Sequence, residues 1–188
     1  MTDKLDASAS YPDDYLPPHQ FALVISCVDV RLLDDLVRFL GHDNLTNRYY
    51  HLTFAGASLA FSSDSPLPIA DKCIKQLHFD GWMAMLKDHI RLTLKLTDKK
   101  LSDVYIVEHR DCGAYRVCLG VDFKDSLKEQ RQEFRMHRKY AMSLKRQLKT
   151  IFQELIDEGC ADKVPRVLSF LMDLRGDVLM LDRPKQAT

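Results

Sequence analysis

The chain has 188 residues, of which 46% are hydrophobic and 29% charged, with 27 basic and 27 acidic side chains. This length suffices for one sizeable domain and is short for two, and the composition is typical of a water-soluble globular protein. The zero formal net charge gives no general reason to expect binding to nucleic acid or to an acidic membrane. Since no run approaches the roughly 18 apolar residues that span a bilayer, we expect neither nucleic acid nor a membrane among the partners.

The first residues differ in character from the rest. Residues 1–20 are predicted to form an N-terminal extension, and residues 21–188 a single domain. The start, Met1 to Tyr15, is polar and acidic, without a basic region followed by an apolar core, so we expect no secretory signal. The five cysteines, an odd number, fit a reducing compartment. The cytoplasm is therefore the expected location.

The first part of the domain alternates between strand and helix patterns. Residues 21–26 form a continuous apolar, β-rich run, which is typical of a buried parallel strand. Apolar residues between 32 and 40 recur at helical spacing, and Gly41 is the predicted C-cap. The aromatic and β-branched residues 49–54 predict a second strand, and the serine, aspartate and prolines of residues 62–68 predict a loop.

The second part continues this alternation. Residues 80–96 carry an apolar helical stripe, and residues 104–107 form the next predicted strand. A long helix is predicted over residues 126–158, and two short strands over residues 164–181 form a hairpin at a sheet edge. We therefore predict an α/β fold with a mostly parallel central β-sheet flanked by helices and a C-terminal edge hairpin.

Two short motifs each follow a predicted strand. Cys27, Asp29 and Arg31 follow the first strand as Cys-x-Asp-x-Arg, and His109 and Cys112 follow the strand 104–107 as His-x-x-Cys. Sites in parallel sheets form at the carboxyl ends of strands, so we expect these side chains to meet. Two thiolates and an imidazole are ligands that Zn²⁺ prefers, and three protein ligands leave the fourth tetrahedral position for water. The sequence therefore predicts a catalytic zinc site of a hydrolase or lyase.

The residues around the expected ligands suggest a chemistry. Bound zinc lowers the pKa of its water towards about 7 and yields a hydroxide nucleophile. Asp29 either accepts a hydrogen bond from that water or occupies the open position itself, and Arg31 holds its carboxylate through a bidentate pair. The alternative for these two residues is a structural ion pair that supports the sheet. Gly113, directly after the second motif, is expected to permit backbone angles that a side chain would hinder.

The order of these motifs resembles the β-class carbonic anhydrases. Ala55-Gly56 falls where that family has an Asn-Ala-Gly segment, and residues 167–173 with Gly176 are similar to its closing hairpin. The resemblance covers about residues 20–182. The short N-terminus and compact spacing look like the small archaeal and bacterial subtype, from which carbonyl sulfide and carbon disulfide hydrolases also come.

The resemblance implies a specific enzyme, a carbonate dehydratase, which is a zinc lyase. Zinc would be held by Cys27, His109 and Cys112, with Asp29 and Arg31 as the catalytic dyad. Zinc-bound hydroxide would attack carbon dioxide, and bicarbonate would leave after a proton passes to solvent. Family members are built on dimers, so the resemblance also implies a homodimer or a higher homo-oligomer.

Some residues depart from the family pattern. Phe54 stands where the family usually has Asn, and it would make the pocket bulkier and more apolar, which suits a sulfur-containing substrate or closes the site. Glu108 precedes the ligand His109 where a small or neutral residue is usual, and its charge would raise the pKa of zinc-bound water. The residues expected to line the substrate pocket are Phe54, Ala55, Gly56 and Gly113.

Two other functions stay open beside reversible hydration of carbon dioxide. The same zinc hydroxide would hydrolyse carbonyl sulfide or carbon disulfide. Alternatively, the chain is a zinc-binding homologue without turnover that acts as a structural or interaction module. The locally basic stretch 124–149 offers a nucleic-acid interpretation, but it lacks interleaved aromatic residues for base stacking, so a solvated helix face is the favoured interpretation.

Overall fold

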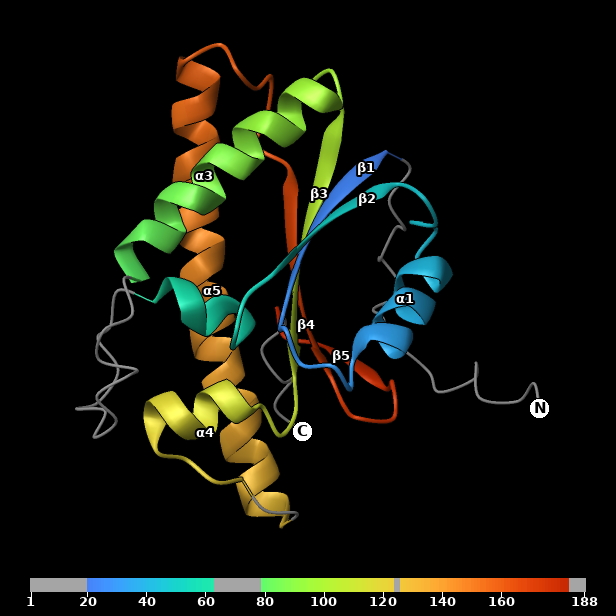
Figure 1. The fold of residues 1–188 in the computed structure, drawn as a ribbon, viewed down its shortest axis with the longest axis vertical. Helices are drawn as coiled ribbons and strands as arrows, with labels where there is room; N and C mark the ends of the chain where they lie inside the picture. The colour runs from blue at the N-terminus through green and yellow to red at the C-terminus, as the bar shows by residue number, and fades with distance from the viewer. Residues whose placement is uncertain (1–19, 63–78, 124–125, 183–188) are drawn as a thin grey trace.

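The computed structural model describes residues 20–62, 79–123 and 126–182, with side chains described from residue 81 onward in the second range. The predicted N-terminal extension over residues 1–20 lies outside these residues except for residue 20, and the predicted loop over residues 62–68 except for residue 62. Figure 1 shows the described part as a twisted central sheet with helices packed on both of its faces.

Within the described residues, five strands form the sheet in the order β2-β1-β3-β4-β5. The neighbours β1–β2, β1–β3 and β3–β4 pair in parallel, and only β4–β5 is antiparallel. The predicted mostly parallel sheet with a C-terminal edge hairpin is therefore confirmed. The strands are β1 (Phe21–Ser26), β2 (Tyr49–Thr53), β3 (Leu101–His109), β4 (Arg166–Met172) and β5 (Val178–Met180).

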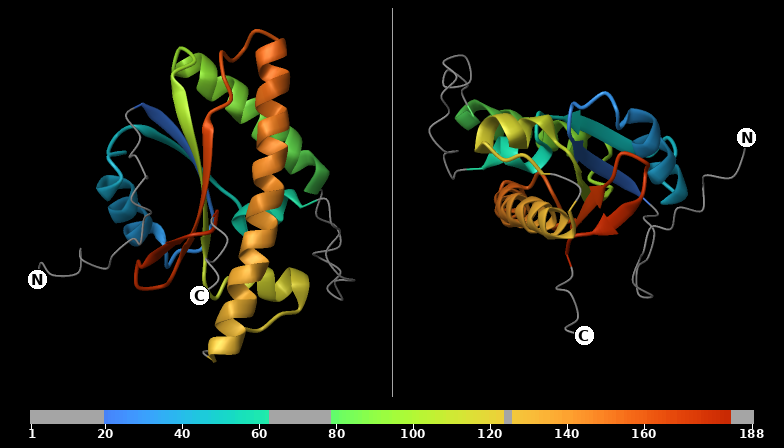
Figure 2. Two further views of the ribbon diagram at one scale, coloured as in Figure 1. Left: turned by 180° about the vertical axis from the view of Figure 1, so that it is seen from behind. Right: turned by 90° about the horizontal axis from the view of Figure 1, so that it is seen from below.

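Helices cover the two faces of the sheet unequally. Figures 1 and 2 show α1 on one face, and α3 with the long α5 on the opposite face. The helical elements are α1 (Leu33–His42), the 3₁₀ helix η1 (Ala57–Phe61), α3 (Phe79–Leu96), α4 (Gly113–Leu119) and α5 (Leu127–Asp157). No helix among the described residues is long and apolar enough to cross a membrane.

The continuous apolar run of β1 follows from its place in the middle of the sheet. Leu23 and Ile25 pack in the core beneath α3 and α5, whereas Ala22 and Val24 pack in the core beneath α1. All four side chains are fully buried, as expected when both faces of a parallel sheet are covered. The bounds predicted for this strand are confirmed, and its carboxyl end leads directly into the first motif.

One predicted helix end needs correction, and one short helix was not predicted. The helix α1 does not end at Gly41 but continues to His42, because the Asp43 N–H still donates to the Phe39 carbonyl; the left-handed residue that ends this segment is Asn44, with φ 61°. The short helix α4, which begins directly after the second motif, was not predicted. With seven residues it is too short to give a clear apolar period.

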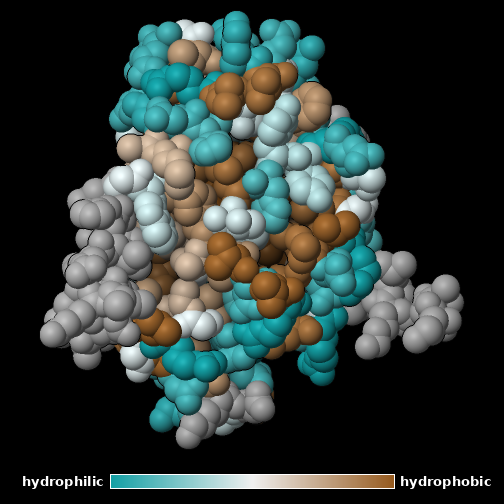
Figure 3. All heavy atoms as spheres, in the orientation of Figure 1, coloured by the Kyte–Doolittle hydropathy of each residue, from teal (hydrophilic) through white to brown (hydrophobic). Residues whose placement is uncertain are grey.

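The surface that faces the viewer in Figure 1 is chemically uneven. Figure 3 shows hydrophobic side chains gathered in the middle of this face, with hydrophilic ones towards both ends. The exposed apolar residues near the first motif and on α1 include Val28, Val30, Leu33 and Val37. The segment after β1 therefore presents apolar side chains to its surroundings as well as the motif residues.

Candidate metal centre

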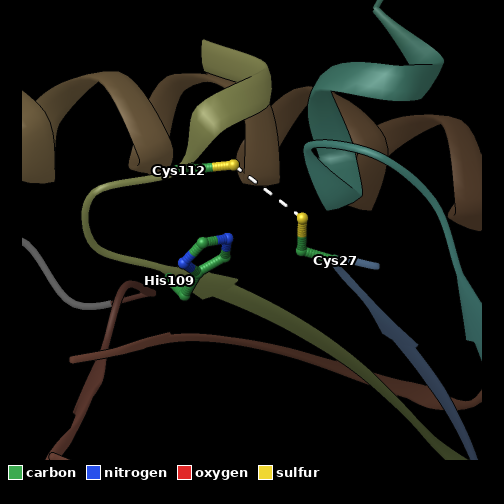
Figure 4. Close-up of side chains that lie close together, drawn as sticks. All are labelled: Cys27, His109 and Cys112. Carbon is green, nitrogen blue, oxygen red and sulfur yellow. Dashed lines mark hydrogen bonds between the residues drawn. The ribbon is translucent and has the colours of Figure 1, made fainter. Parts of the chain in front are cut away.

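Three potential metal ligands meet at the carboxyl edge of the sheet. Cys27 follows β1 directly, His109 is the last residue of β3, and Cys112 is the N-cap of α4. Their ligand atoms all lie within 4.8 Å of one another, and all three side chains are buried. Figure 4 shows the three side chains converging from two strands and the turn before α4. The structure thus brings together the group predicted from two motifs far apart in the sequence, and this group can hold a metal.

The His109 ring is oriented for ligation through Nε2. Its Nδ1 lies 2.8 Å from the Arg110 carbonyl oxygen, so Nδ1 donates a hydrogen bond there. Its Nε2 is buried without a hydrogen-bond partner among the described residues. A ligating histidine typically donates its other ring N–H to a carbonyl or carboxylate in this way. The buried Nε2 is therefore the atom that fits a metal ion.

The sulfur spacing also fits zinc. Cys27 Sγ and Cys112 Sγ lie 3.8 Å apart. A tetrahedral zinc ion with Zn–S bonds of about 2.3 Å places its two sulfurs about 3.8 Å apart. Two thiols and an imidazole nitrogen form the borderline-soft donor set that favours zinc over magnesium or calcium. The described residues supply three ligands, which would leave the fourth tetrahedral position open.

The two thiols share their proton unequally. A hydrogen bond from Cys112 lowers the pKa of Cys27 to about 4 despite burial, and His109 and the Gly56 N–H, 3.3 Å from the sulfur, act in the same direction. The pKa of Cys112 is raised by that hydrogen bond to Cys27 and by burial. Burial alone would lower the pKa of His109, but the neighbouring Cys27 raises it. Metal binding would therefore displace protons from a group that already contains one thiolate.

Asp29 and Arg31 form a tightly held pair beside the three ligands. Arg31 Nε donates to Asp29 Oδ1 at 2.9 Å and Nη2 donates to Oδ2 at 2.7 Å, and the Arg31 backbone N–H adds a third hydrogen bond. These hydrogen bonds lower the pKa of Asp29 to about 2, so its carboxylate is ionised near neutral pH. Asp29 Oδ2 lies 3.9 Å from His109 Nε2. The carboxylate therefore stands next to the candidate centre, and its orientation is fixed by Arg31.

A second carboxylate that the sequence did not single out also holds Arg31. Arg31 Nη1 donates to Asp111 Oδ2 at 2.8 Å, and Nη2 donates to the Asp111 carbonyl at 3.0 Å. The hydrogen bond from Arg31 to the carboxylate, with the charges of Arg116 and Arg31, lowers the pKa of Asp111. The same carboxylate accepts from Arg116 Nη2 at 2.6 Å. The position of Asp111 between the two ligands of the second motif is the only signal in the sequence that could have indicated this contact.

The predicted pocket residues have different surroundings. The Phe54 side chain is buried, and its ring packs against Phe61 and Trp82 with centroids 4.6 and 6.0 Å away. Its backbone N–H donates to the Ser26 carbonyl, next to Cys27 in the chain. Ala55 is exposed. The Phe54 backbone is therefore tied to the end of β1, whereas its ring belongs to an aromatic cluster in the core beneath α3 and α5.

The two glycines of the predicted pocket also differ. Gly56 has φ +79°, and a Cβ there would lie 3.1 Å from the Cβ atoms of Ala114 and Leu59. Gly113 lies in α4 without a positive φ, and a Cβ there would meet no atom within 4 Å. The expectation that Gly113 supplies unusual backbone angles is therefore wrong. The positive φ in this turn, +54°, belongs to Asp111.

The side-chain hydrogen bonds of Glu108 are made with residues other than the three ligands. Its side chain is buried and accepts hydrogen bonds from Ser58, Tyr115 and His137. Its charge contributes to the raised pKa of Cys112. The motif pattern indicated the charge of Glu108 but not these partners, which come from three other segments of the chain.

Comparisons with known proteins give distant similarities. No protein-family model matches the chain. An uncharacterized protein of Rickettsia conorii is 26% identical over 156 residues, which span 83% of this chain and 69% of that protein. One of Rickettsia bellii is 26% identical over 154 residues, 82% of this chain and 77% of that protein. The crystal structure of a carbonic anhydrase from Streptococcus mutans matches 89% of this chain and 86% of that chain, with a TM-score of 0.47 and 14% identity. Because none of these similarities is close, we infer function from the side chains of the centre.

Proposed function

We propose that this chain is a zinc-dependent enzyme that hydrates carbon dioxide reversibly to bicarbonate, as the resemblance of its motifs to β-class carbonic anhydrases implies. One observation carries the proposal: an ionised carboxylate, Asp29, is held by Arg31 3.9 Å from the ligand nitrogen of a Cys-His-Cys group. A purely structural zinc site uses four protein ligands and needs no such neighbour. Three ligands beside a fixed carboxylate are the arrangement expected when water and substrate share the remaining position.

Each residue has a distinct part in the proposed reaction. Zinc bound by Cys27, His109 and Cys112 would lower the pKa of water and polarise a substrate oxygen. Asp29 accepts a hydrogen bond from the attacking water and so orients its lone pair towards the substrate carbon. Arg31 occupies both oxygens of that carboxylate, which keeps Asp29 from turning into the fourth ligand position.

A substrate pocket bordered by Phe54, as the motif resemblance implies, would suit a small neutral substrate. Phe54, Phe61 and Trp82 form an aromatic cluster whose first member directly follows β2 and is tied by its backbone to Ser26. The phenylalanine rings of this cluster provide no hydrogen bond to a charged substrate, and such an apolar wall would accept a linear neutral molecule such as carbon dioxide. Bicarbonate, once formed, is charged and would leave this surface for solvent.

The same cluster favours a second candidate function, hydrolysis of carbonyl sulfide or carbon disulfide. These molecules are linear like carbon dioxide, but their sulfur atoms are larger and more polarisable and pack well against aromatic rings. The ligand group and the Asp29–Arg31 pair would serve this reaction without change. The choice between the two functions therefore depends on the substrate that the aromatic wall admits.

Stopped-flow hydration of carbon dioxide tests the proposal, using zinc-loaded wild-type protein and an Asp29→Ala variant. We expect zinc-dependent turnover in the wild type. In Asp29→Ala, whose zinc content should be unchanged, the rate should fall by roughly a hundredfold or more, as on loss of a positioned acid–base group. The matched control is Asp34→Ala, which removes an exposed carboxylate on α1 and should leave the rate unchanged.

The same proteins distinguish the alternatives. Turnover of carbonyl sulfide or carbon disulfide, without hydration of carbon dioxide, would support the second candidate. Full zinc occupancy without turnover of any of the three substrates would contradict both enzymes and leave a structural or interaction module. An Asp29→Ala variant as fast as Asp34→Ala would remove Asp29 from the mechanism.

A further inference from the structure

Glu108 is a buried carboxylate that three segments of the chain share. Its side chain is 1% exposed. The Ser58 backbone N–H donates to Oε1 at 2.9 Å, and the Tyr115 hydroxyl and His137 Nδ1 lie 3.1 and 2.9 Å from Oε2. An ionised carboxylate only accepts, so the tyrosine and histidine both donate to the same oxygen. Ser58 belongs to η1, Tyr115 to α4 and His137 to α5.

Two of these segments, and the strand that carries Glu108 itself, shape the candidate metal centre. Gly56, which donates its N–H to Cys27 Sγ, directly precedes η1 as its N-cap. Cys112 is the N-cap of α4, and His109 ends β3 next to Glu108. The Glu108 carboxylate thus connects β3 with η1 and α4. His109 ends β3, Cys112 directly precedes α4, and Gly56, the donor to Cys27, directly precedes η1.

The helix α5 supplies a second buried glutamate to the same region. Glu133 lies one helical turn before His137, so the two side chains project from the same face of α5. Glu133 Oε1 accepts a hydrogen bond from the Asp111 N–H at 2.6 Å, and its other oxygen lies 3.7 Å from the Arg110 guanidinium. Asp111, with φ +54°, is the strained residue of the turn between the ligands. Glu133 on α5 therefore holds the turn between His109 and Cys112 through contacts with Asp111 and Arg110.

Position 108 is buried, and an apolar side chain would fill such a position without the cost of burying a charged group. Burying an ionised carboxylate is unfavourable unless hydrogen bonds compensate for its lost hydration. Burial and the charge of Glu108 raise the pKa of Tyr115, so its hydroxyl keeps the proton that it donates. Hydrogen bonds to a charged acceptor are stronger and shorter than neutral ones, and they fix direction as well as distance. A carboxylate shared by three donors therefore restricts the distances and directions between those donors. An apolar side chain at this position would not restrict them in this way.

We propose that Glu108 is a positioning residue for the metal centre: through Ser58, Tyr115 and His137 it holds η1, α4 and α5 against β3 at the spacing that brings Cys27, His109 and Cys112 to one ion. The effect is geometric and differs from the expectation that the charge of Glu108 acts on the zinc-bound water. The inference rests on the metal binding in the proposed function but not on turnover, so it also applies to a zinc protein without activity.

Metal affinity and a spectroscopic signature test the inference in the variant Glu108→Gln. The amide keeps the shape of the side chain and an acceptor for the Ser58 N–H, but it replaces the oxygen that Tyr115 and His137 share with a donor. We expect zinc affinity, measured by competition with a chromophoric chelator, to fall about tenfold or more, as for other partners that orient metal ligands. The visible spectrum of the cobalt-substituted protein should also change, because it reports ligand geometry.

The matched control is Asp103→Asn, which makes the same chemical change at a buried carboxylate on the same strand. Asp103 lies near the opposite end of β3, where Ser102 and Arg166 donate to it. Asp103→Asn should lower the melting temperature but leave zinc affinity and the cobalt spectrum unchanged. Tyr115→Phe, which deletes one donor hydroxyl, should weaken zinc binding in the same direction as Glu108→Gln and provides the test if Glu108→Gln does not fold.

The outcomes separate this inference from the proposed function. Wild-type affinity and spectrum in folded Glu108→Gln, or in folded Tyr115→Phe if Glu108→Gln does not fold, would overturn the positioning role and leave the proposed function standing. Failure of the wild-type protein to bind zinc or cobalt would overturn both. Weakened binding with an altered spectrum, in a variant as well folded as Asp103→Asn, would support the positioning role even if no substrate is turned over.

Discussion

Cys112 is the residue whose replacement tests the ligand group most simply. We expect Cys112→Ser to lose most of its bound zinc, because a hydroxyl is a much poorer zinc ligand than a thiolate and the side chain is buried beside Cys27. Metal analysis of the purified variant, with circular dichroism to confirm folding, measures the effect.

Cys118 offers a matched control within the same short helix. It is a half-buried free cysteine in α4 and does not belong to the ligand group. Cys118→Ser should keep the zinc content of the wild type. Full zinc occupancy in Cys112→Ser would contradict the assignment of Cys112 as a ligand.

The sequence predicted the ligands but not the side chains that surround them. Cys27 and His109 could be recognised because each lies in a short motif after a strand, and parallel strands bring their carboxyl ends together. The contact between Glu108 and His137 joins β3 to the middle of α5. Such a contact depends on how the helix packs, and local spacing does not record it. The sequence around His137 therefore gives no indication that its side chain reaches Glu108.

The turn that leads into η1 places strict demands on Gly56. Its φ of +79° strains any L-residue by about 1–2 kcal/mol, and an added Cβ would press against Ala114 and Leu59 at 3.1 Å. We expect Gly56→Ala to lower the free energy of unfolding by more than the backbone strain alone. Its zinc affinity should also fall, because the Gly56 N–H that donates to Cys27 would be displaced. Urea unfolding and zinc competition measure the two effects.

Gly120 and Gly113, at the two ends of α4, are the controls for the Gly56→Ala variant. Gly120 has φ +63° but nothing within 4 Å of an added Cβ, so Gly120→Ala should show the strain without the close contact. Gly113 lies in α4 with open space around it, and Gly113→Ala should be neutral or stabilising by about 0.4–1 kcal/mol. Equal losses of stability and zinc affinity in Gly56→Ala and Gly120→Ala would contradict the role of close packing at Gly56.

The predicted elements show where sequence patterns are informative. The bounds of β1 match the prediction because both faces of the strand are covered. Its sequence is therefore a continuous apolar run whose ends are easy to locate. The helix α1 passes through Gly41 because the Asp43 N–H still donates to the Phe39 carbonyl. A glycine alone therefore does not mark the end of this helix. The helix α4 escaped prediction because its seven residues depend on packing of Tyr115 and Leu119 more than on a repeated apolar stripe.

A metal bound at the candidate centre would connect β1, β3 and α4, so its removal should affect the folded molecule as a whole. A ligand that binds only the folded state stabilises it by about 2.7 kcal/mol at a free concentration of 100 times Kd. For a chain of this size, a stabilisation of about 2.7 kcal/mol raises the melting temperature by roughly 5–10 °C. We expect a strong chelator to lower the melting temperature by this order and added zinc to restore it.

The variant Cys112→Ser shows whether this effect comes from the proposed centre. Its melting temperature should already be lowered, and the chelator should have little further effect because the variant binds little zinc. A chelator that lowers the melting temperature of the variant as much as that of the wild type would mean that the stabilising metal binds elsewhere on the chain.

Zinc K-edge X-ray absorption of the purified, zinc-loaded protein tests the central claim most directly. The geometry of Cys27, His109 and Cys112 predicts two sulfur neighbours at about 2.3 Å and two nitrogen or oxygen neighbours at about 2.0–2.1 Å, one of them from His109 and one from solvent. A first shell of nitrogen and oxygen without sulfur, or four sulfurs, would contradict a three-ligand centre with an open position.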